Sequence, residues 1–211
     1  PPPAPSWETL RAVNHRAFAA AIAQPLPGAL YTRDAATLDA VLRTPSPTGA
    51  WLVKRPWSYR GNGRVRVREH LDEATQRWLR ASMASGEGVQ VEPEVERVED
   101  HGLHGYLSPD GFVTWGTLTR QVVDARGQWR ETVRADDDAL PKHERLALHD
   151  IGERVVAALR ARGYHGPFGL DAFRWRDPCG ALRYNPLCEL NARYSMGFGV
   201  GMRGRRADLD A

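Results

Sequence analysis

Residues Asn185 to Gly201, NPLCELNARYSMGFGVG, contain the pattern that decides the fold. At its centre, Glu189, Asn191 and Arg193 follow one another at intervals of two residues. On a β-strand this spacing places the three side chains on one face, while the apolar residues between them point the other way. An unpaired buried polar group costs about 1–3 kcal/mol, so such a face needs a partner. Carboxylate and amide oxygens suit Mg²⁺ and a guanidinium suits phosphate, so the stretch predicts a site for a metal-bound phosphate.

The strand that carries this pattern has a partner just upstream. Residues 168–176 and 181–193 are predicted to form two strands of a hairpin around a turn at Asp177-Pro178-Cys179-Gly180. Asp171 and Glu189 are each nine residues from Gly180, so the hairpin brings the two carboxylates opposite one another within about one register step.

Facing carboxylates on adjacent strands repel each other unless a cation or a proton lies between them. We therefore predict that Asp171, Glu189 and Asn191 bind one or two Mg²⁺ ions. The alternative is a solvent-exposed face on which the acids pair with nearby arginines: Arg174, Arg176 or Arg183.

A second group of residues surrounds a glycine-containing loop. Lys54 ends a short apolar strand, and the alternating Arg-Val segment that starts at Arg64 begins the next. The loop between them contains Arg60, Gly61 and Gly63, and glycine permits positive φ and close backbone approach. An ammonium and free N–H groups placed in this way can surround phosphates. No Gly-Lys-Ser/Thr opens a helix, so this is not a Walker motif, and by itself such a hairpin is more often only a turn.

The third group is the extended segment from Glu92 to Val95. Its backbone would offer N–H and C=O groups to the edge of an adenine, with Val95 or a neighbour as donor because Pro93 has no N–H. Glu99, seven residues after Glu92, is a candidate for the ribose hydroxyls. A plain linker between two lobes would look the same, so this segment alone does not decide the function.

Composition indicates an ordinary globular protein: 211 residues, of which 42% are hydrophobic and 26% charged. No apolar run approaches the ~18 residues that span a bilayer, which predicts no membrane partner. The net charge of +3 comes without a long basic run, so nucleic acid is the weaker interpretation. Cys179 and Cys188 could form a disulfide, but we favour free thiols and a reducing, cytoplasmic location.

Helical and strand patterns divide the chain into two lobes. Residues 1–13 are expected to be a linker or a truncated edge, 14–85 a small lobe with the glycine-loop hairpin, and 86–211 a large lobe with the metal site. Helical periodicity recurs around residues 6–22, 34–42, 71–83 and 141–163. The predicted fold class is α+β, with mixed or antiparallel sheets flanked by helices.

Taken in this order, the three groups of residues resemble the ATP-grasp superfamily, over roughly Asn14 to Met202. Its members hold ATP between two α+β lobes. The resemblance implies that Asp171, Glu189 and Asn191 are metal ligands for Mg²⁺, with Mn²⁺ as an alternative. Arg193 in the ELNAR motif would lie near the transferring phosphate or acyl-phosphate.

The same resemblance assigns the remaining site residues. Lys54 matches the lysine over the α and β phosphates, and the segment from Tyr59 to Arg64 matches the loop that closes on them. Glu92 to Val95 matches the adenine hinge, and Glu99 the acid that contacts ribose.

Two residues depart from the family pattern. The phosphate lysine that members carry near the start of the first lobe is absent, and Arg16 is the nearest match. D-Alanine–D-alanine ligase places an arginine two residues before the first metal carboxylate, where this chain has Gly169. The Rossmann-like substrate domain that normally precedes the lobes is also missing; an upstream segment, a partner or a homo-oligomer would supply it.

These expectations define a function. The resemblance implies an ATP- and Mg²⁺-dependent ligase that activates a small carboxylate as an acyl-phosphate for attack by an amine or a similar nucleophile. Two alternatives stay open: a phosphotransferase on the same fold, and a module that binds ATP without turnover.

Overall fold

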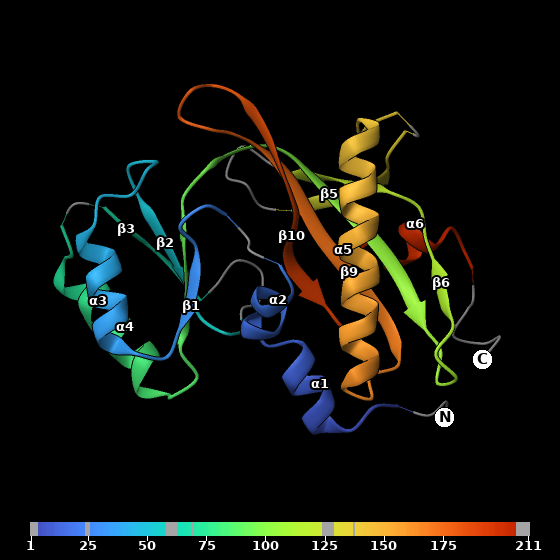
Figure 1. The fold of residues 1–211 in the computed structure, drawn as a ribbon, viewed down its shortest axis with the longest axis horizontal. Helices are drawn as coiled ribbons and strands as arrows, with labels where there is room; N and C mark the ends of the chain where they lie inside the picture. The colour runs from blue at the N-terminus through green and yellow to red at the C-terminus, as the bar shows by residue number, and fades with distance from the viewer. Residues whose placement is uncertain are drawn as a thin grey trace.

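The computed structural model describes residues 4–23, 26–57, 63–68, 70–123, 129–136 and 138–205. They form two sheets flanked by helices (Figure 1). In chain order the elements are α1 (Trp7–Val13), α2 (Arg16–Ile22), β1 (Leu30–Thr32), α3 (Ala35–Arg43), β2 (Trp51–Lys54), β3 (Arg64–Val67), α4 (Glu73–Ala84), β4 (Val89–Pro93), β5 (Glu96–Leu107), β6 (Val113–Trp115), β7 (Thr119–Val123), β8 (Trp129–Arg134), α5 (Lys142–Ala161), β9 (Gly166–Arg176), β10 (Leu182–Asn191) and α6 (Phe198–Met202).

The first sheet has the strand order β1-β4-β2-β3, and its pairings are antiparallel. Alternation along β2 and β4 separates its two faces. Val53 and Val91 are fully buried and pack with Leu38 of α3 and Leu79 of α4. The opposite face therefore carries the residues between them, including Lys54. The predicted hairpin is confirmed, because Lys54 lies opposite Arg64 across β2 and β3.

The second sheet has the order β10-β9-β5-β7-β8, with β6 paired to β5. The long helix α5 crosses one face of it (Figure 1). Its buried residues Ile151, Val155 and Leu159 pack in one core with Leu170 of β9 and Leu190 of β10. Because side chains alternate along a strand, Asp171 and Glu189 lie on the other face, away from α5.

The N-terminal region differs from expectation. Residues 7–13, expected as a linker or truncated edge, form α1, and Val13 is buried in the core beneath α5. Asn14 is the C-cap of this helix and His15 is the N-cap of α2, so the single helical pattern of residues 6–22 becomes two helices. The lobe boundary expected at residue 85 also shifts, because β4 pairs with β1 and β2 of the first sheet.

Local signals in the sequence account for several other boundaries. The side chains of Ser6, Asp34 and Asp72 cap α1, α3 and α4, as serine and aspartate commonly do. Gly180 adopts φ 83° in the turn between β9 and β10, a conformation that favours glycine. The α+β fold class with antiparallel sheets flanked by helices is confirmed.

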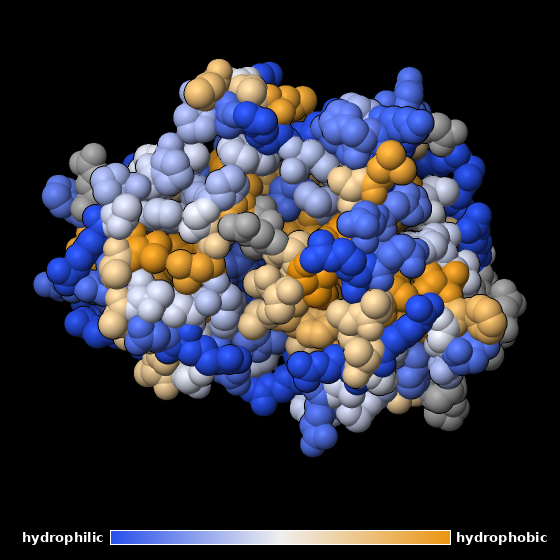
Figure 2. Space-filling model, viewed as in Figure 1, coloured by the Kyte–Doolittle hydropathy of each residue, from blue (hydrophilic) through white to orange (hydrophobic). Residues whose placement is uncertain are grey.

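Polar and apolar residues are interspersed on the face shown in Figure 2, where patches of apolar residues are separated by hydrophilic ones. Within the described ranges, no helix is both long and apolar enough to cross a bilayer.

Candidate functional site

Two connected cavities lie between the two sheets. The inner cavity, of about 160 Å³, is lined by Arg16, Lys54, Arg64, Arg97, Asp100, Gln121, Asp171, Cys188 and Glu189. The hinge cavity, of about 540 Å³, is lined by Leu52, Lys54, Arg64, Glu92, Pro93, Glu94, Val95, Arg97, Val98, Glu99, Asp100, Arg120, Gln121 and Val122. Five residues line both cavities, so together they form one cleft with charged walls.

Asp171 and Glu189 face each other in the inner cavity. The structure pairs them directly across β9 and β10, and a β-bulge between Asn185 and Glu189 sets this register. Gln121 donates from Nε2 to Oδ1 of Asp171 at 3.0 Å, and Asn191 donates from Nδ2 to Oδ2 at the same distance. Burial, and then the neighbouring charge of Glu189, raise the pKa of Asp171 to about 7.

This pair fits a divalent cation. Within the described parts of the chain, no group of three or more His, Cys, Asp and Glu side chains is arranged to hold a metal. The donor set here is instead two carboxylates and the amide of Asn191, all of them hard oxygen donors. A cation bound between the acids would offset both the burial of Asp171 and the charge of Glu189, the two causes that raise the pKa of Asp171.

Cations line the rest of the inner cavity. Lys54 is 7% exposed and forms an ion pair with Glu92, which also accepts a hydrogen bond from Gln90 at 2.7 Å. Arg16 is 9% exposed, with Nη2 3.5 Å from Oε1 of Glu189. The Nε–H of Arg16 donates to the carbonyl of Arg55 at 3.0 Å, which fixes the guanidinium beside the acids. The residue nearest to the missing family lysine is thus inside the site.

The predicted hinge residues line the hinge cavity, but two of them are already paired. Glu92 is engaged by Lys54, while Val95 is half-buried at the cavity wall. The carboxylate of Glu99 lies 3.4 Å from Arg174 and 3.5 Å from His101. A role for Glu99 at ribose stays a prediction.

The glycine loop is described only at its end. Gly63 adopts φ 81° and its carbonyl accepts a hydrogen bond from the N–H of Arg55 at 2.8 Å, which closes the hairpin. The structure does not place Gly63 at either cavity. Arg60 and Gly61 lie outside the described residues.

Arg193 does not share the strand face with Glu189 and Asn191, contrary to the spacing argument. Strand β10 ends at Asn191, because the N–H of Ala192 donates to Oδ1 of Asn14 at 3.0 Å and its carbonyl accepts from Nδ2 of Asn14 at 3.1 Å. Arg193 is exposed and its Nη1 donates to the same Asn14 oxygen at 3.1 Å. Arg193 therefore lines neither cavity.

Sequence reasoning missed three residues of the cleft: Arg97, Asp100 and Gln121. They lie on β5 and β7, and Asp100 pairs with Gln121 across these strands. No local motif marks them, since they belong to a meander whose order in the sheet places β5 between β9 and β7. Only that strand order brings Gln121 to Asp171.

The two cysteines are free thiols, as expected. Cys179 is exposed in the hairpin turn, while Cys188 lines the inner cavity. Burial raises the pKa of Cys188 to about 12, so its thiol stays protonated at neutral pH.

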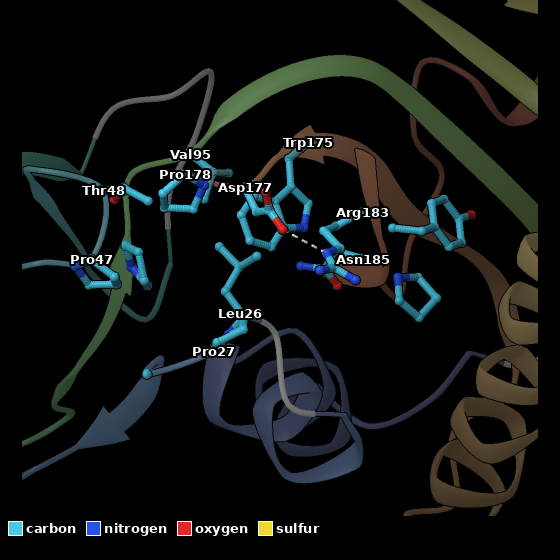
Figure 3. Close-up of a pocket in the computed structure, with 14 residues that line it drawn as sticks. Leu26, Pro27, Pro47, Thr48, Val95, Trp175, Asp177, Pro178, Arg183 and Asn185 are labelled. Carbon is cyan, nitrogen blue, oxygen red and sulfur yellow. Dashed lines mark hydrogen bonds and ion pairs between the residues drawn. The ribbon is translucent and has the colours of Figure 1, made fainter. Parts of the chain in front are cut away.

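A larger cavity lies elsewhere and includes Val95 of the hinge segment in its lining (Figure 3). It has about 800 Å³, and its walls include five prolines and Trp175. The charged side chains that line it, Asp177 and Arg183, pair with each other at 2.9 Å, as the dashed line in Figure 3 shows. It contains none of the metal or phosphate candidates, so we place the site in the smaller, charged cleft.

No protein-family model and no curated protein matches the sequence. Solved structures do match. Biotin carboxylase from Campylobacter jejuni, in a β,γ-ATP complex, aligns at 17% identity with a TM-score of 0.68, over 94% of this chain and 44% of that one. N5-carboxyaminoimidazole synthetase from Staphylococcus aureus, complexed with ADP, aligns at 12% identity with a TM-score of 0.55, over 97% of this chain and 46% of that one. D-alanyl-alanine synthetase A from Vibrio cholerae aligns at 15% identity with a TM-score of 0.59, over 89% of this chain and 55% of that one.

These proteins are all built on the ATP-grasp fold. This chain spans about half the length of each. At such low identity the likeness concerns the fold, and it agrees with the resemblance found at Lys54 and the ELNAR motif. The two lobes of this chain have the ATP-grasp fold.

Proposed function

We propose that this chain is the ATP-binding part of an ATP- and Mg²⁺-dependent ligase that activates a carboxylate as an acyl-phosphate. One observation carries the proposal: two facing carboxylates, Asp171 and Glu189, share a small cavity with the cationic side chains of Arg16, Lys54 and Arg64. The carboxylates suit a divalent metal ion and the cationic side chains suit phosphate groups, so the cavity suits a metal-bound polyphosphate.

Cavity size supports a division of the nucleotide between the two cavities. Sites for ligands of this size occupy roughly 300–1,000 Å³, so an inner cavity of about 160 Å³ holds only part of a nucleotide. The phosphates would lie there, next to Lys54, Arg16 and Arg64. The base and ribose would extend into the hinge cavity of about 540 Å³, along Val95.

Asp171, Glu189 and Asn191 would hold Mg²⁺, or Mn²⁺ in its place. The ion would supply positive charge to the β and γ phosphates as negative charge develops. Lys54 and Arg16 would add charge from the small lobe and from α2. Arg193, implied by the ELNAR motif near the transferring phosphate, would first have to leave Asn14.

The reaction would have two steps. A carboxylate oxygen of the acid attacks the γ-phosphorus and ADP leaves; the amine then attacks the acyl carbon and phosphate leaves. Positioning and charge stabilisation drive both steps, so no protein nucleophile is required. The acid and amine would be small molecules, with a further domain or a second copy completing their pocket, and the cytoplasmic location stays a prediction.

ADP release tests the proposal directly. The protein is incubated with ATP, MgCl₂ and a panel of carboxylates, each with hydroxylamine as a general nucleophile that converts an acyl-phosphate into a hydroxamate. We expect a hydroxamate with at least one acid, and at least a 100-fold lower rate for Glu189→Ala. The matched control is Glu73→Ala on α4, whose side chain is 90% exposed and far from the acids in the sequence.

The outcomes separate the alternatives. A stable phosphorylated product without hydroxamate would favour a phosphotransferase. Tight Mg²⁺-dependent ATP binding with no product would favour a binding module. Equal ADP release by the wild type and Glu189→Ala would rule out the metal site.

A further inference from the structure

Arg97 occupies the junction between the inner and hinge cavities. It lies at the start of β5, where the chain has just crossed from the first sheet to the second (Figure 1). Its side chain lines both cavities. A nucleotide with its phosphates in one cavity and its base in the other has to pass this residue.

The guanidinium of Arg97 is held in place by two contacts. It stacks over the ring of Phe173, with Cζ 4.0 Å from the ring centroid. Its Nη1 also donates to Oδ1 of Asp100 at 2.8 Å. The neighbouring side chains of Cys188, Asp100 and Glu92 also favour its charged form.

Phe173 is the aromatic surface that Arg97 conceals. Its ring follows Asp171 by two residues on β9 and therefore lies on the same face of the sheet as the metal candidates. Phe173 is 0% exposed and lines neither cavity. It packs with Leu26 and Trp175, and close to Val95 of the hinge segment. A flat aromatic face beside the hinge is the kind of surface on which a nucleotide base stacks.

We propose that the Arg97 guanidinium on Phe173 occupies the place of the nucleotide base, and that ATP binds by displacing it from the ring. This inference rests on the proposed function, because it concerns how the same cleft admits its nucleotide. Arg97 is then a residue that sets nucleotide affinity: each binding event has to break its stacking and its ion pair with Asp100.

The proposal fixes the sign of a mutational effect. A cation–π contact and a partly exposed ion pair are both weak interactions, so breaking the two together weakens binding by about 3- to 30-fold. Removing Arg97 removes that cost. The factor is the same for ATP, ADP and adenosine, because the contacts that are broken do not depend on the phosphate tail.

The experiment measures dissociation constants by calorimetry with ATP and MgCl₂ and with ADP, and by competition against ATP for adenosine. Arg97→Ala is compared with wild type and with Arg183→Ala. The control removes an arginine from another Arg–Asp pair, Arg183–Asp177 at 2.9 Å, which lies outside both cavities. We expect 3- to 30-fold tighter binding of all three ligands by Arg97→Ala and no change for Arg183→Ala.

Two results would overturn the inference while leaving the proposed function intact. One is unchanged affinity in Arg97→Ala. The other is weaker ATP binding with unchanged adenosine binding, which would make Arg97 a phosphate contact. If none of the three proteins binds a nucleotide, the proposed function fails and this inference with it.

A measurement on the wild type covers the case in which Arg97→Ala does not fold. The ring current of Phe173 shifts the Arg97 side-chain resonances upfield, and they are assigned by their loss in Arg97→Lys. Saturating ATP should move these resonances toward unstacked values. Resonances that keep their positions at saturation would contradict the displacement.

Discussion

Two pairs of charged residues line the cleft: a buried pair of opposite charges on the first sheet and a half-buried pair of like charges on the second. On the first sheet, Lys54 and Glu92 carry opposite charges, with side chains 9% and 6% exposed, and Gln90 adds a hydrogen bond to the acid. On the second sheet, Asp171 and Glu189 carry like charges and lie directly opposite each other in register. The first pair is complete within the chain, whereas the two acids of the second have one ion-pair partner between them in the described residues, Arg16 at 3.5 Å from Glu189.

The opposite-charge pair therefore contributes mainly to the stability of the fold, and the like-charge pair mainly to cation binding. A buried ion pair that loses one partner leaves an uncompensated charge in a poorly solvated place, so Lys54–Glu92 should be sensitive to single substitutions. Repulsion between two like charges lowers the stability of the folded protein, and a cation bound between them removes that repulsion.

Lys54→Met should destabilise the protein by about 3–5 kcal/mol, because Glu92 stays buried without its partner. Urea unfolding measures the loss. The double variant Lys54→Met/Glu92→Leu should regain most of the stability but not the ATP affinity. Arg43→Met is the control, since its pair with Asp39 is exposed and worth under about 1 kcal/mol. Equal stability of Lys54→Met and wild type would mean that the pair is not buried in solution.

Glu189→Gln keeps the size of the side chain but removes one charge from the like-charged pair. We expect Mg²⁺-dependent ATP turnover to fall about 100-fold, which is roughly 2.7 kcal/mol of barrier, while stability stays level or rises. Steady-state ADP release measures the turnover, and thermal unfolding of the same sample measures the stability. A variant that loses stability along with activity would contradict the like-charge argument.

The pH dependence of stability should carry the signature of Asp171. Its pKa is raised from 3.8 to about 7, so the folded state holds a proton that the unfolded state has lost between these values. Stability from this group therefore falls as pH rises from about 4 to 7. Relative to wild type, Asp171→Asn should gain about 2 kcal/mol between pH 4.5 and 7.5, partial solvation keeping the figure modest.

Urea unfolding at the two pH values measures that gain, with Asp39→Asn as an exposed control. Adding MgCl₂ at pH 7.5 should reduce the difference, since the ion stabilises only the wild type. A difference that does not change with pH would exclude the coupling between Asp171 and Glu189.

Arg16 gives the smallest effect. Arg16→Ala should weaken ATP binding about tenfold, through loss of one cation beside the phosphates, while Arg16→Lys should weaken it about threefold because the charge stays. Calorimetry with ATP and MgCl₂ measures both. Arg11→Ala is the matched control, since Arg11 forms its ion pair with Glu87 at the surface of α1. If both Arg16 variants bound ATP with the affinity of the wild type, Arg16 would not be part of the ATP site.

Much of the site could be predicted because it is local. The facing of Asp171 and Glu189 follows from their distances to the turn at Gly180, and the Lys54 hairpin follows from strand periodicity on both sides of a loop. Arg193 could not be predicted in the same way. Its position depends on Asn14, a residue 179 positions away, which takes the backbone hydrogen bonds that would have extended β10.

The sequence by itself determined the two sheets, the hairpin that opposes Asp171 to Glu189, and the cation at Lys54, because turns, alternation and helix caps act over a few residues. The tertiary structure alone decided what shares the cleft. Strand order brings Gln121 to Asp171, the packing of α2 brings Arg16 to Glu189, and the crossing between sheets sets Arg97 on Phe173. These contacts join segments far apart in the chain, and no local pattern encodes which of them will meet.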